Sequence, residues 1–332
     1  MKALVGVAAI AVIVGGATAG PVAADSETAL DQARRSAQAS SFSGVVDVAW
    51  RDGKVMRQRQ LTVEAAHGVL LFGGPTPLMA LDQARLVHED AAWDVLWPAA
   101  FARLSRPDSA AKYQQRVSVG PSILGNETVV VDIRRGERVR ERLYVERYSG
   151  LLLRREQFDD RGRIQRSVGF RSLRIDATAP PMARPVSTAT KALRSVAAST
   201  LHGAFSAPVV IGDGYRRTGT FRQGAVVQVV YSDGIYDLSV FEQRGRLGAK
   251  AEPRGGRPVR VDGAKGWHYT WPGGQVILWQ AGRTVYTVVA DAPYDDVLGA
   301  IRTVKGTSAG PSVAFRFRQA CRSLVGAFTD DR

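Results

Sequence analysis

Residue types that perform chemistry are sparse in this chain of 332 residues. The 4 histidines stand far apart, and no two have the spacing of metal ligands on a helix. They are His67, His88, His202 and His268. Such isolated histidines are typical of ordinary surface or core positions, and the sequence predicts neither a metal site nor a cofactor.

One short motif has the outline of a catalytic serine turn. The segment 306–310 reads Gly-Thr-Ser-Ala-Gly, the pattern of the nucleophile elbow in hydrolases. That turn requires a strand before the serine and a helix directly after it. Here a predicted helix precedes the motif and Pro311 follows it. The pattern therefore indicates a flexible linker.

Adjacent aspartates at 159–160 and at 295–296 could suggest acid–base chemistry. Neighbouring residues on a strand point to opposite faces, so Asp159-Asp160 favours a turn. Asp295-Asp296 opens a predicted helix over 293–303, where negative charge stabilises the N-terminus. The chain is accordingly predicted not to be an enzyme.

The stretch 142–175 predicts an antiparallel meander. It contains three runs of strand length, separated by Ser149-Gly150 and by Asp159-Asp160-Arg161-Gly162. Both separators contain residues that tolerate the left-handed conformation of tight hairpin turns. Leu143 and Val145 fall on one face of the first run.

The third run of this meander changes its alternation. Ile164, Val168 and Phe170 share one face, but the apolar positions then become odd-numbered from Leu173. A β-bulge near 171–172 would return these side chains to a single buried face.

The residues before this meander predict a helix over 26–39 and three strands. The strands are Phe42–Trp50, Val55–Glu64 and Val69–Phe72. Aromatic and apolar residues gather in this part of the chain, and two interpretations stay open: a packed core, or the wall of a cavity for an apolar ligand. The proposed cavity residues are Trp50, Leu71, Phe72, Trp93 and Trp97.

The second half of the chain predicts a separate α+β unit. Residues 178–200 are rich in Pro, Ala, Ser and Thr and indicate a linker, with a short helix near 188–198. Strands are expected at Ala225–Tyr231, Ile235–Phe241, Trp267–Trp271, Gln275–Gln280 and Thr284–Ala290, before the helix at 293–303. Pro253–Arg257 is expected to be a loop.

Charge and the N-terminus restrict the class of partner. The net charge is +14, which favours anionic partners. An apolar run after Met1-Lys2, followed by small residues, is typical of a signal peptide over 1–24. Export disfavours nucleic acid as a partner. Cys321 is the only cysteine, so no disulfide forms within the chain.

Several of these segments resemble the RseB/MucB family of periplasmic sigma-E regulatory proteins. The resemblance is carried by Arg103-Leu-Ser, Val117-Ser-Val-Gly120, Tyr144-Val145, Ser149-Gly-Leu-Leu-Leu-Arg154, Phe158-Asp-Asp-Arg-Gly162 and Tyr231-Ser-Asp-Gly-Ile-Tyr-Asp-Leu-Ser-Val-Phe241. The family's usual opening to the second domain is replaced here by Ala207–Tyr215, which keeps only Gly214-Tyr215.

The resemblance implies an α+β fold of two domains. Residues 26–177 would form a lipoprotein-carrier-like, half-open antiparallel β-barrel or curved sheet with helices inside. Residues 201–305 would form a smaller antiparallel α+β domain, and 306–332 a basic tail. The basic tail is expected either to contact a membrane surface peripherally or to be a frayed terminus.

The function implied is that of an exported, periplasmic or extracytoplasmic negative regulator of a sigma factor. It would bind the extracytoplasmic segment of a transmembrane anti-sigma factor and sense a lipid or lipoprotein. The alternative is a lipid or lipoprotein carrier of the cell envelope. Because Arg and Tyr are enriched at interfaces, a partner-binding surface is expected at the domain junction. Its residues are Arg154, Arg155, Arg216, Arg217 and Tyr231.

Overall fold

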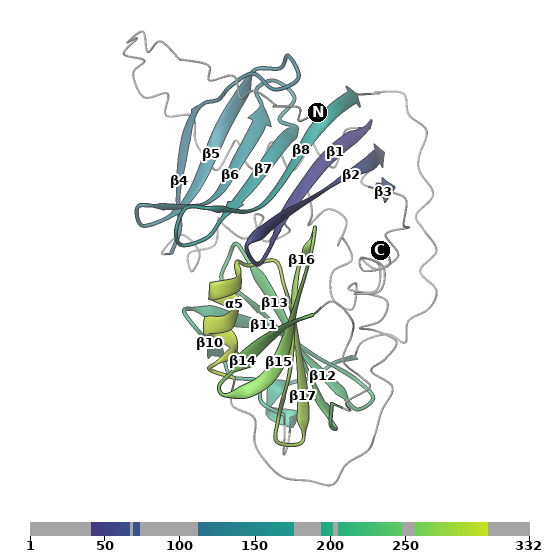
Figure 1. Ribbon diagram of the computed structural model, residues 1–332, viewed down its shortest axis with the longest axis vertical. Coiled ribbons are helices and arrows are strands. Elements are labelled where there is room, and N and C mark those ends of the chain that lie inside the picture. The colour runs from purple at the N-terminus through teal and green to yellow at the C-terminus, as the bar shows by residue number, and fades with distance from the viewer. Residues whose placement is uncertain are drawn as a thin grey trace, which may run out of the picture.

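Two antiparallel β-sheets dominate the structure (Figure 1). The computed structural model describes residues 41–66, 69–73, 112–175, 194–201, 205–247 and 256–304, with only the backbone of the strand at 69–73. The predicted signal peptide, the helix at 26–39, Trp93, Trp97 and the basic tail lie outside these ranges. So do the helices expected inside the first sheet.

The first sheet has eight strands in the order β3-β2-β1-β8-β7-β6-β5-β4. Its members are β1 (Phe42–Asp52), β2 (Val55–Ala66), β3 (Val69–Gly73), β4 (Gln114–Val119), β5 (Thr128–Arg135), β6 (Arg138–Glu146), β7 (Leu152–Phe158) and β8 (Ile164–Ile175). The end strands β3 and β4 do not pair with each other, so the sheet is open, as the predicted fold class requires.

The second sheet has nine strands, eight of them in the order β10-β11-β12-β13-β17-β16-β15-β14, while β9 pairs with β11. They are β9 (Arg194–Ser195), β10 (Val210–Ile211), β11 (Tyr215–Gln223), β12 (Val226–Ser232), β13 (Asp237–Arg244), β14 (Arg257–Val261), β15 (Ala264–Trp271), β16 (Gly274–Ala281) and β17 (Thr284–Ala290). The helix α5 (Tyr294–Ile301) follows the last strand, and a short 3-10 helix spans Ala198–Thr200. The α+β class predicted from the sequence is confirmed.

The predicted β-bulge lies in β8. Val45 of β1 is paired with Ser172, whereas the next residue, Val46, is paired with Phe170. Arg171 is therefore the extra residue of the bulge. After it, Leu173 packs against the same apolar cluster as Phe170, which confirms the prediction.

Two expected loop or helix segments are strands instead. Arg194–Ser195 pairs with β11 inside the region where a short helix was predicted near 188–198. Arg257, expected in a loop, begins β14. Proline removes a donor from the ladder but is tolerated on an edge strand, and β14 with Pro258 is the last strand of its sheet.

The two apolar cores each contain residues from both sheets. One cluster joins Val131 and Leu143 of the first sheet to Tyr231 and Tyr286 of the second. The other joins Trp50 and its neighbours on β1 to Trp267, Tyr269 and Trp271 of β15. The second sheet therefore packs against part of the first, and both clusters lie across the junction of the two sheets.

Candidate functional site at the domain junction

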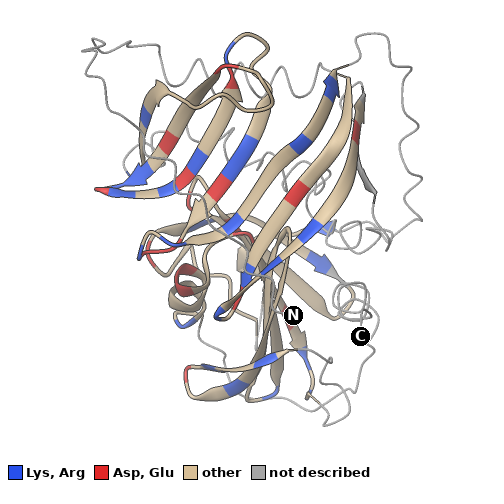
Figure 2. Ribbon diagram, turned by 45° about the horizontal axis from the view of Figure 1, so that its top comes forward, with Lys and Arg blue, Asp and Glu red and all other residues tan. Residues whose placement is uncertain are grey.

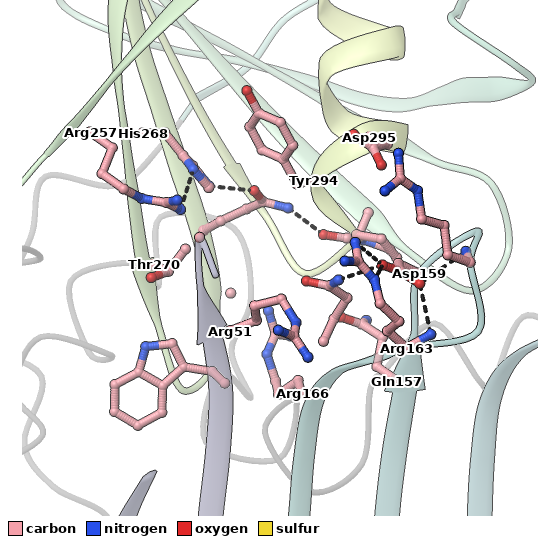
Figure 3. Close-up of a pocket in the computed structure, with 18 of the residues that line it drawn as sticks. Arg51, Gln157, Asp159, Arg163, Arg166, Arg257, His268, Thr270, Tyr294 and Asp295 are labelled. Carbon is pink, nitrogen blue, oxygen red and sulfur yellow. Dashed lines mark hydrogen bonds and ion pairs between the residues drawn. The ribbon is translucent and has the colours of Figure 1, made fainter. Parts of the chain in front are cut away.

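A cavity of about 340 Å³ opens where the two sheets meet (Figure 3). The first sheet contributes residues from the β1–β2 turn, the β7–β8 turn and strand β8, and the second contributes residues from β14 to β16 and the start of α5. Its charged lining residues are Arg51, Asp159, Arg161, Arg163, Arg166, Arg257 and Asp295. Arginine outnumbers aspartate in this lining, so the cavity is basic.

Arg166 is the buried cation of this cavity. Its side chain is 7% exposed, and among the described residues Nη1 donates only long hydrogen bonds, of 3.4 Å to Gly273 O and 3.3 Å to Asp291 O. Its Nε is buried without a partner. In the part of the chain that the structure describes, no carboxylate forms an ion pair with it. Burial, followed by the like charge of Arg155, lowers the pKa of Arg166 to about 10.

Arg51 brings a second guanidinium to the cavity from the end of β1. Its Nε and Nη2 both lie 3.2 Å from the backbone oxygen of Ile164, which holds the β1 end against β8. Figure 3 shows Arg51 and Arg166 entering the space between the two sheets. A carbonyl carries no net charge, and among the described residues no ion pair to Arg51 is present.

A hydrogen-bonded chain of side chains closes the side of the cavity formed by the second sheet. Arg257 pairs with Asp52, the last residue of β1, at 3.0 Å and donates to Nδ1 of His268 at 3.1 Å. Because arginine only donates, the His268 proton is on Nε2, which donates to Gln275 Oε1 at 2.7 Å. Burial and the charge of Arg257 lower the His268 pKa to about 4, so this imidazole is neutral at pH 7.

Beside the cavity, a buried ion pair lies on the inner face of the first sheet. Arg155 is 3% exposed and donates to both carboxylate oxygens of Glu141, at 3.0 and 3.1 Å. Gln157 donates to Glu141 at 3.1 Å and to the backbone oxygen of Asp291, in the second unit, at 2.8 Å. A paired buried arginine and an unpaired one, Arg166, therefore share this face.

The turn after β12 anchors the other side of the junction. Asp233 Oδ2 accepts hydrogen bonds from Tyr113 Oη at 2.6 Å and from Lys112 Nζ at 2.7 Å. Its Oδ1 accepts from the backbone nitrogens of Ile235 and Tyr236, at 3.1 and 2.9 Å. The carboxylate thus orders its own turn and holds the start of β4 against it.

Arg140 connects the motifs that resemble the RseB/MucB family. Its side chain is 1% exposed and pairs with Asp160 of the β7–β8 turn and with Asp296 in the first turn of α5. Its backbone oxygen accepts a 3.3 Å hydrogen bond from Tyr236. The segments Phe158–Gly162 and Tyr231–Phe241, far apart in sequence, meet at this residue.

Of the predicted ligand-cavity residues, the structure describes the side chain of Trp50 alone. It is 7% exposed, packs in the apolar cluster with Trp267 and Trp271, and also lines the junction cavity. Leu71 and Phe72 lie on β3, of which the backbone is described. With Trp93 and Trp97 outside the described ranges, the apolar ligand cavity stays a prediction.

The predicted partner-binding residues are dispersed. Arg154 and Arg155 are neighbours on β7 and point to opposite faces, so Arg154 is on the outer face while Arg155 is buried with Glu141. Arg216 is exposed, whereas Arg217 pairs across strands with Tyr231, which is 1% exposed. A change of both Arg154 and Arg155 would therefore disturb the core, because Arg155 belongs to the interior.

Arg154 borders a second hollow, on the outer face of the first sheet. This hollow measures about 610 Å³ and is lined by residues of β1, β2, β7 and β8, among them Arg59 and Arg171. Arg154 pairs with Glu156 at 2.5 Å and lies over the Tyr144 ring at 5.6 Å. Figure 2 shows basic and acidic positions interspersed along these strands instead of a single charged block.

The sequence contains one signal for the junction residues that were not predicted: a charged residue at an inward position of a strand. Arg166 stands between Ile164 and Val168 at an inward position of an alternating strand, and Glu141 holds the equivalent place before Leu143. A charged residue at an inward position indicates a buried polar network. Gln157 and His268 lie on strands too continuously buried to show such alternation.

The described residues include neither a membrane-spanning helix nor a metal-binding cluster. Across these ranges no helix has both the length and the apolar character needed to span a membrane. The same ranges contain no cluster of three His, Cys, Asp or Glu side chains suited to binding a metal ion.

Comparison with known proteins gave matches among solved structures. No protein-family model and no curated protein matches the chain. The crystal structure of MucB in complex with MucA(peri) is 18% identical, with a TM-score of 0.47, and the match covers 87% of this chain and 100% of that one. The Pseudomonas aeruginosa MucA/MucB complex has 18% identity, a TM-score of 0.46, and coverage of 88% and 100%.

A further match is partial. A putative outer membrane lipoprotein-sorting protein domain from Vibrio parahaemolyticus is 10% identical, with a TM-score of 0.20, and the match covers 47% of this chain and 95% of that one. The solved structures thus include the RseB/MucB family that the sequence motifs resemble. At these TM-scores, no residue role transfers from those proteins to this chain.

Proposed function

We propose that this chain is an exported negative regulator of a sigma factor that acts outside the cytoplasm. It binds the extracytoplasmic segment of a transmembrane anti-sigma factor and shields that segment from proteolysis. MucB was solved with MucA(peri), and the partner proposed here is of the same kind. A binding protein, not an enzyme, is proposed.

One observation carries this proposal. The segments Phe158–Gly162 and Tyr231–Phe241, on which the family resemblance rests, meet at Arg140 beside a basic cavity. Their shared location indicates a role in building this junction. A basic junction suits an acidic partner segment, because complementary charge raises both specificity and association rate.

Sensing of a lipid or lipoprotein is the second part of the proposal. Trp50 and the strand β3 belong to the sheet that would line the apolar hollow, and the lipid ligand would weaken the binding of the partner. A carrier of lipid or lipoprotein through the envelope is the alternative. A carrier needs the hollow alone, whereas a regulator also needs a surface for its protein partner.

Co-purification tests the proposal. The full chain is expressed with an affinity tag in its native host, the envelope is solubilised in mild detergent, and bound protein and lipid are quantified by mass spectrometry. Recovery of a transmembrane anti-sigma factor supports the regulator. Recovery of stoichiometric lipid without any such protein would favour the carrier and refute the regulator.

The exposed members of the predicted surface provide variants for this experiment. Arg154→Glu and Arg216→Glu reverse charge at exposed positions. Contact with an acidic partner at either position should weaken binding by about 1–3 kcal/mol. Arg138→Glu, at the exposed end of the β5–β6 hairpin, is the control. Equal recovery of the anti-sigma factor with all three variants would show that Arg154 and Arg216 do not belong to the partner-binding surface.

A further inference from the structure

Arg166 places a positive charge inside the protein, and no ion pair to it is present among the described residues. Asp291 and Glu141 are near enough for their charges to act on Arg166, but neither forms an ion pair with it, whereas Arg155 on the same face has Glu141 as a bidentate partner. An arginine cannot relieve the cost of burial by losing its proton, because its guanidinium stays charged at neutral pH. A buried charge without a partner lowers stability, so it needs a compensating ligand or another reason to be retained.

The cavity beside Arg166 has room and charge for an anion. Asp159 does not compensate Arg166 or Arg51, because it accepts hydrogen bonds from Arg163 and Gln165 and from the backbone of its own turn. Arg166 retains an unpartnered buried Nε, and Arg51 contacts only a backbone oxygen in the described structure. Two guanidinium groups can share the oxygens of one carboxylate through charge-assisted hydrogen bonds.

We propose that the junction cavity binds a carboxylate side chain from an acidic peptide segment, with Arg166 as the recognising residue and Arg51 as the second donor. This inference rests on the proposed function, in which an extracytoplasmic segment of a partner occupies the junction. It adds the chemistry of the contact: one acidic side chain enters the cavity and neutralises Arg166.

The lining of the cavity favours a peptide over a lipid. Gln157, Gln165, Thr270 and Gln275 surround the arginines with amide and hydroxyl groups. Such groups match the backbone and polar side chains of an extended segment, whereas an acyl chain requires apolar walls. The volume of about 340 Å³ suits a few residues of a peptide and not a folded domain.

Titration calorimetry of the full chain with a tetraglutamate peptide at low salt tests the site. Tetraglutamine, which has the same length without charge, and inorganic phosphate are the comparison ligands. We expect saturable binding of tetraglutamate and at least ten-fold weaker binding of the other two. Arg166→Gln should weaken tetraglutamate binding at least ten-fold, while the control Arg138→Gln should change it less than two-fold.

Three results would overturn the inference: absence of saturable tetraglutamate binding, unchanged affinity in Arg166→Gln, or phosphate binding as tight as that of the peptide. If Arg166→Gln does not fold, Arg51→Gln decides, because Arg51 is half-buried. Binding weakened at least three-fold supports the site, and unchanged binding refutes it. Failure of the proposed function is separate: the peptide would still bind while no anti-sigma factor co-purified.

Discussion

The phenol of Tyr113 and the carboxylate of Asp233 form a 2.6 Å hydrogen bond across the junction of the two sheets. Both groups are buried, and burial followed by the charge of Asp233 raises the pKa of Tyr113 far above its ordinary value. The phenol is therefore a permanent donor at any physiological pH. Together with Lys112, it holds the first sheet against the turn that follows β12.

Changing the two ends of this hydrogen bond should have unequal effects. Tyr113→Phe leaves Asp233 paired with Lys112 and two backbone nitrogens, so we expect a loss of about 1 kcal/mol in unfolding free energy. Asp233→Asn also removes the ion pair between half-buried Lys112 and the buried carboxylate and weakens the turn, so we expect a loss of roughly 2–4 kcal/mol. Urea unfolding monitored by tryptophan fluorescence measures both, and equal losses would contradict this assignment.

Charge reversal at the two neighbouring arginines of β7 should lower stability by very different amounts. Arg155→Glu would place a carboxylate against the buried Glu141, and we expect a loss of at least 3–5 kcal/mol or failure to fold. Arg154→Glu affects an exposed side chain and should cost within about 1 kcal/mol. Soluble yield and thermal unfolding of both variants check this, and similar behaviour would show that the two side chains do not lie on opposite faces.

Replacing the unpaired arginine by an apolar residue should stabilise the free protein. Arg166→Met removes a buried charge that lacks a carboxylate in the described structure, and we expect an increase of about 1–3 kcal/mol in unfolding free energy. Arg155→Met is the matched control, because it leaves the buried Glu141 without its arginine partner and should destabilise the protein by about 3–5 kcal/mol. Differential scanning calorimetry separates them, and destabilisation by Arg166→Met would show that Arg166 is compensated.

The buried carboxylate of Glu242 should make the stability of the folded protein depend on pH. Its carboxylate is fully buried, and burial raises its pKa to about 7. Among the described residues, only the Ser206 backbone nitrogen donates to it, at 3.0 Å. The folded state therefore retains a proton that the unfolded state releases between pH 4.5 and 7, so this group lowers stability as pH rises through that window. The full effect is roughly 3 kcal/mol.

Glu242→Gln tests this dependence because it keeps an acceptor for Ser206 and removes the titration. The stability of the variant relative to wild type should increase between pH 5 and pH 8. Urea unfolding at several pH values measures the difference, with Glu127→Gln, an exposed site, as control. If wild type and Glu242→Gln change in parallel over this range, Glu242 does not carry a raised pKa.

Local patterns in the sequence predicted much of the fold. The change of parity after Phe170 located the bulge at Arg171, because alternation is a property of consecutive residues and needs no tertiary information. Strand β14 was not predicted, since Pro258 argues against a strand until its place at the sheet edge is known. Edge position is a property of the whole sheet and cannot be read from a short segment.

The candidate site was less accessible to sequence reasoning. An inward arginine such as Arg166 is visible in the pattern, but whether it has a partner depends on residues more than a hundred positions away, including Asp291 and Gly273. Arg154 and Arg155 are adjacent, and composition cannot distinguish the solvated member from the buried one. Pairing between strands, which places Arg155 opposite Leu143 and Val168, settles that question.

Because apolar clusters contain residues of both sheets, we expect the two sheets to unfold together as one cooperative unit. Neither sheet can unfold without exposing the aromatic surface of the other, because Trp50 on β1 and Trp267 on β15 belong to one cluster. Expressed alone, either half would present this surface to solvent and be prone to aggregation. A ligand held at the junction would therefore slow amide exchange in both halves together.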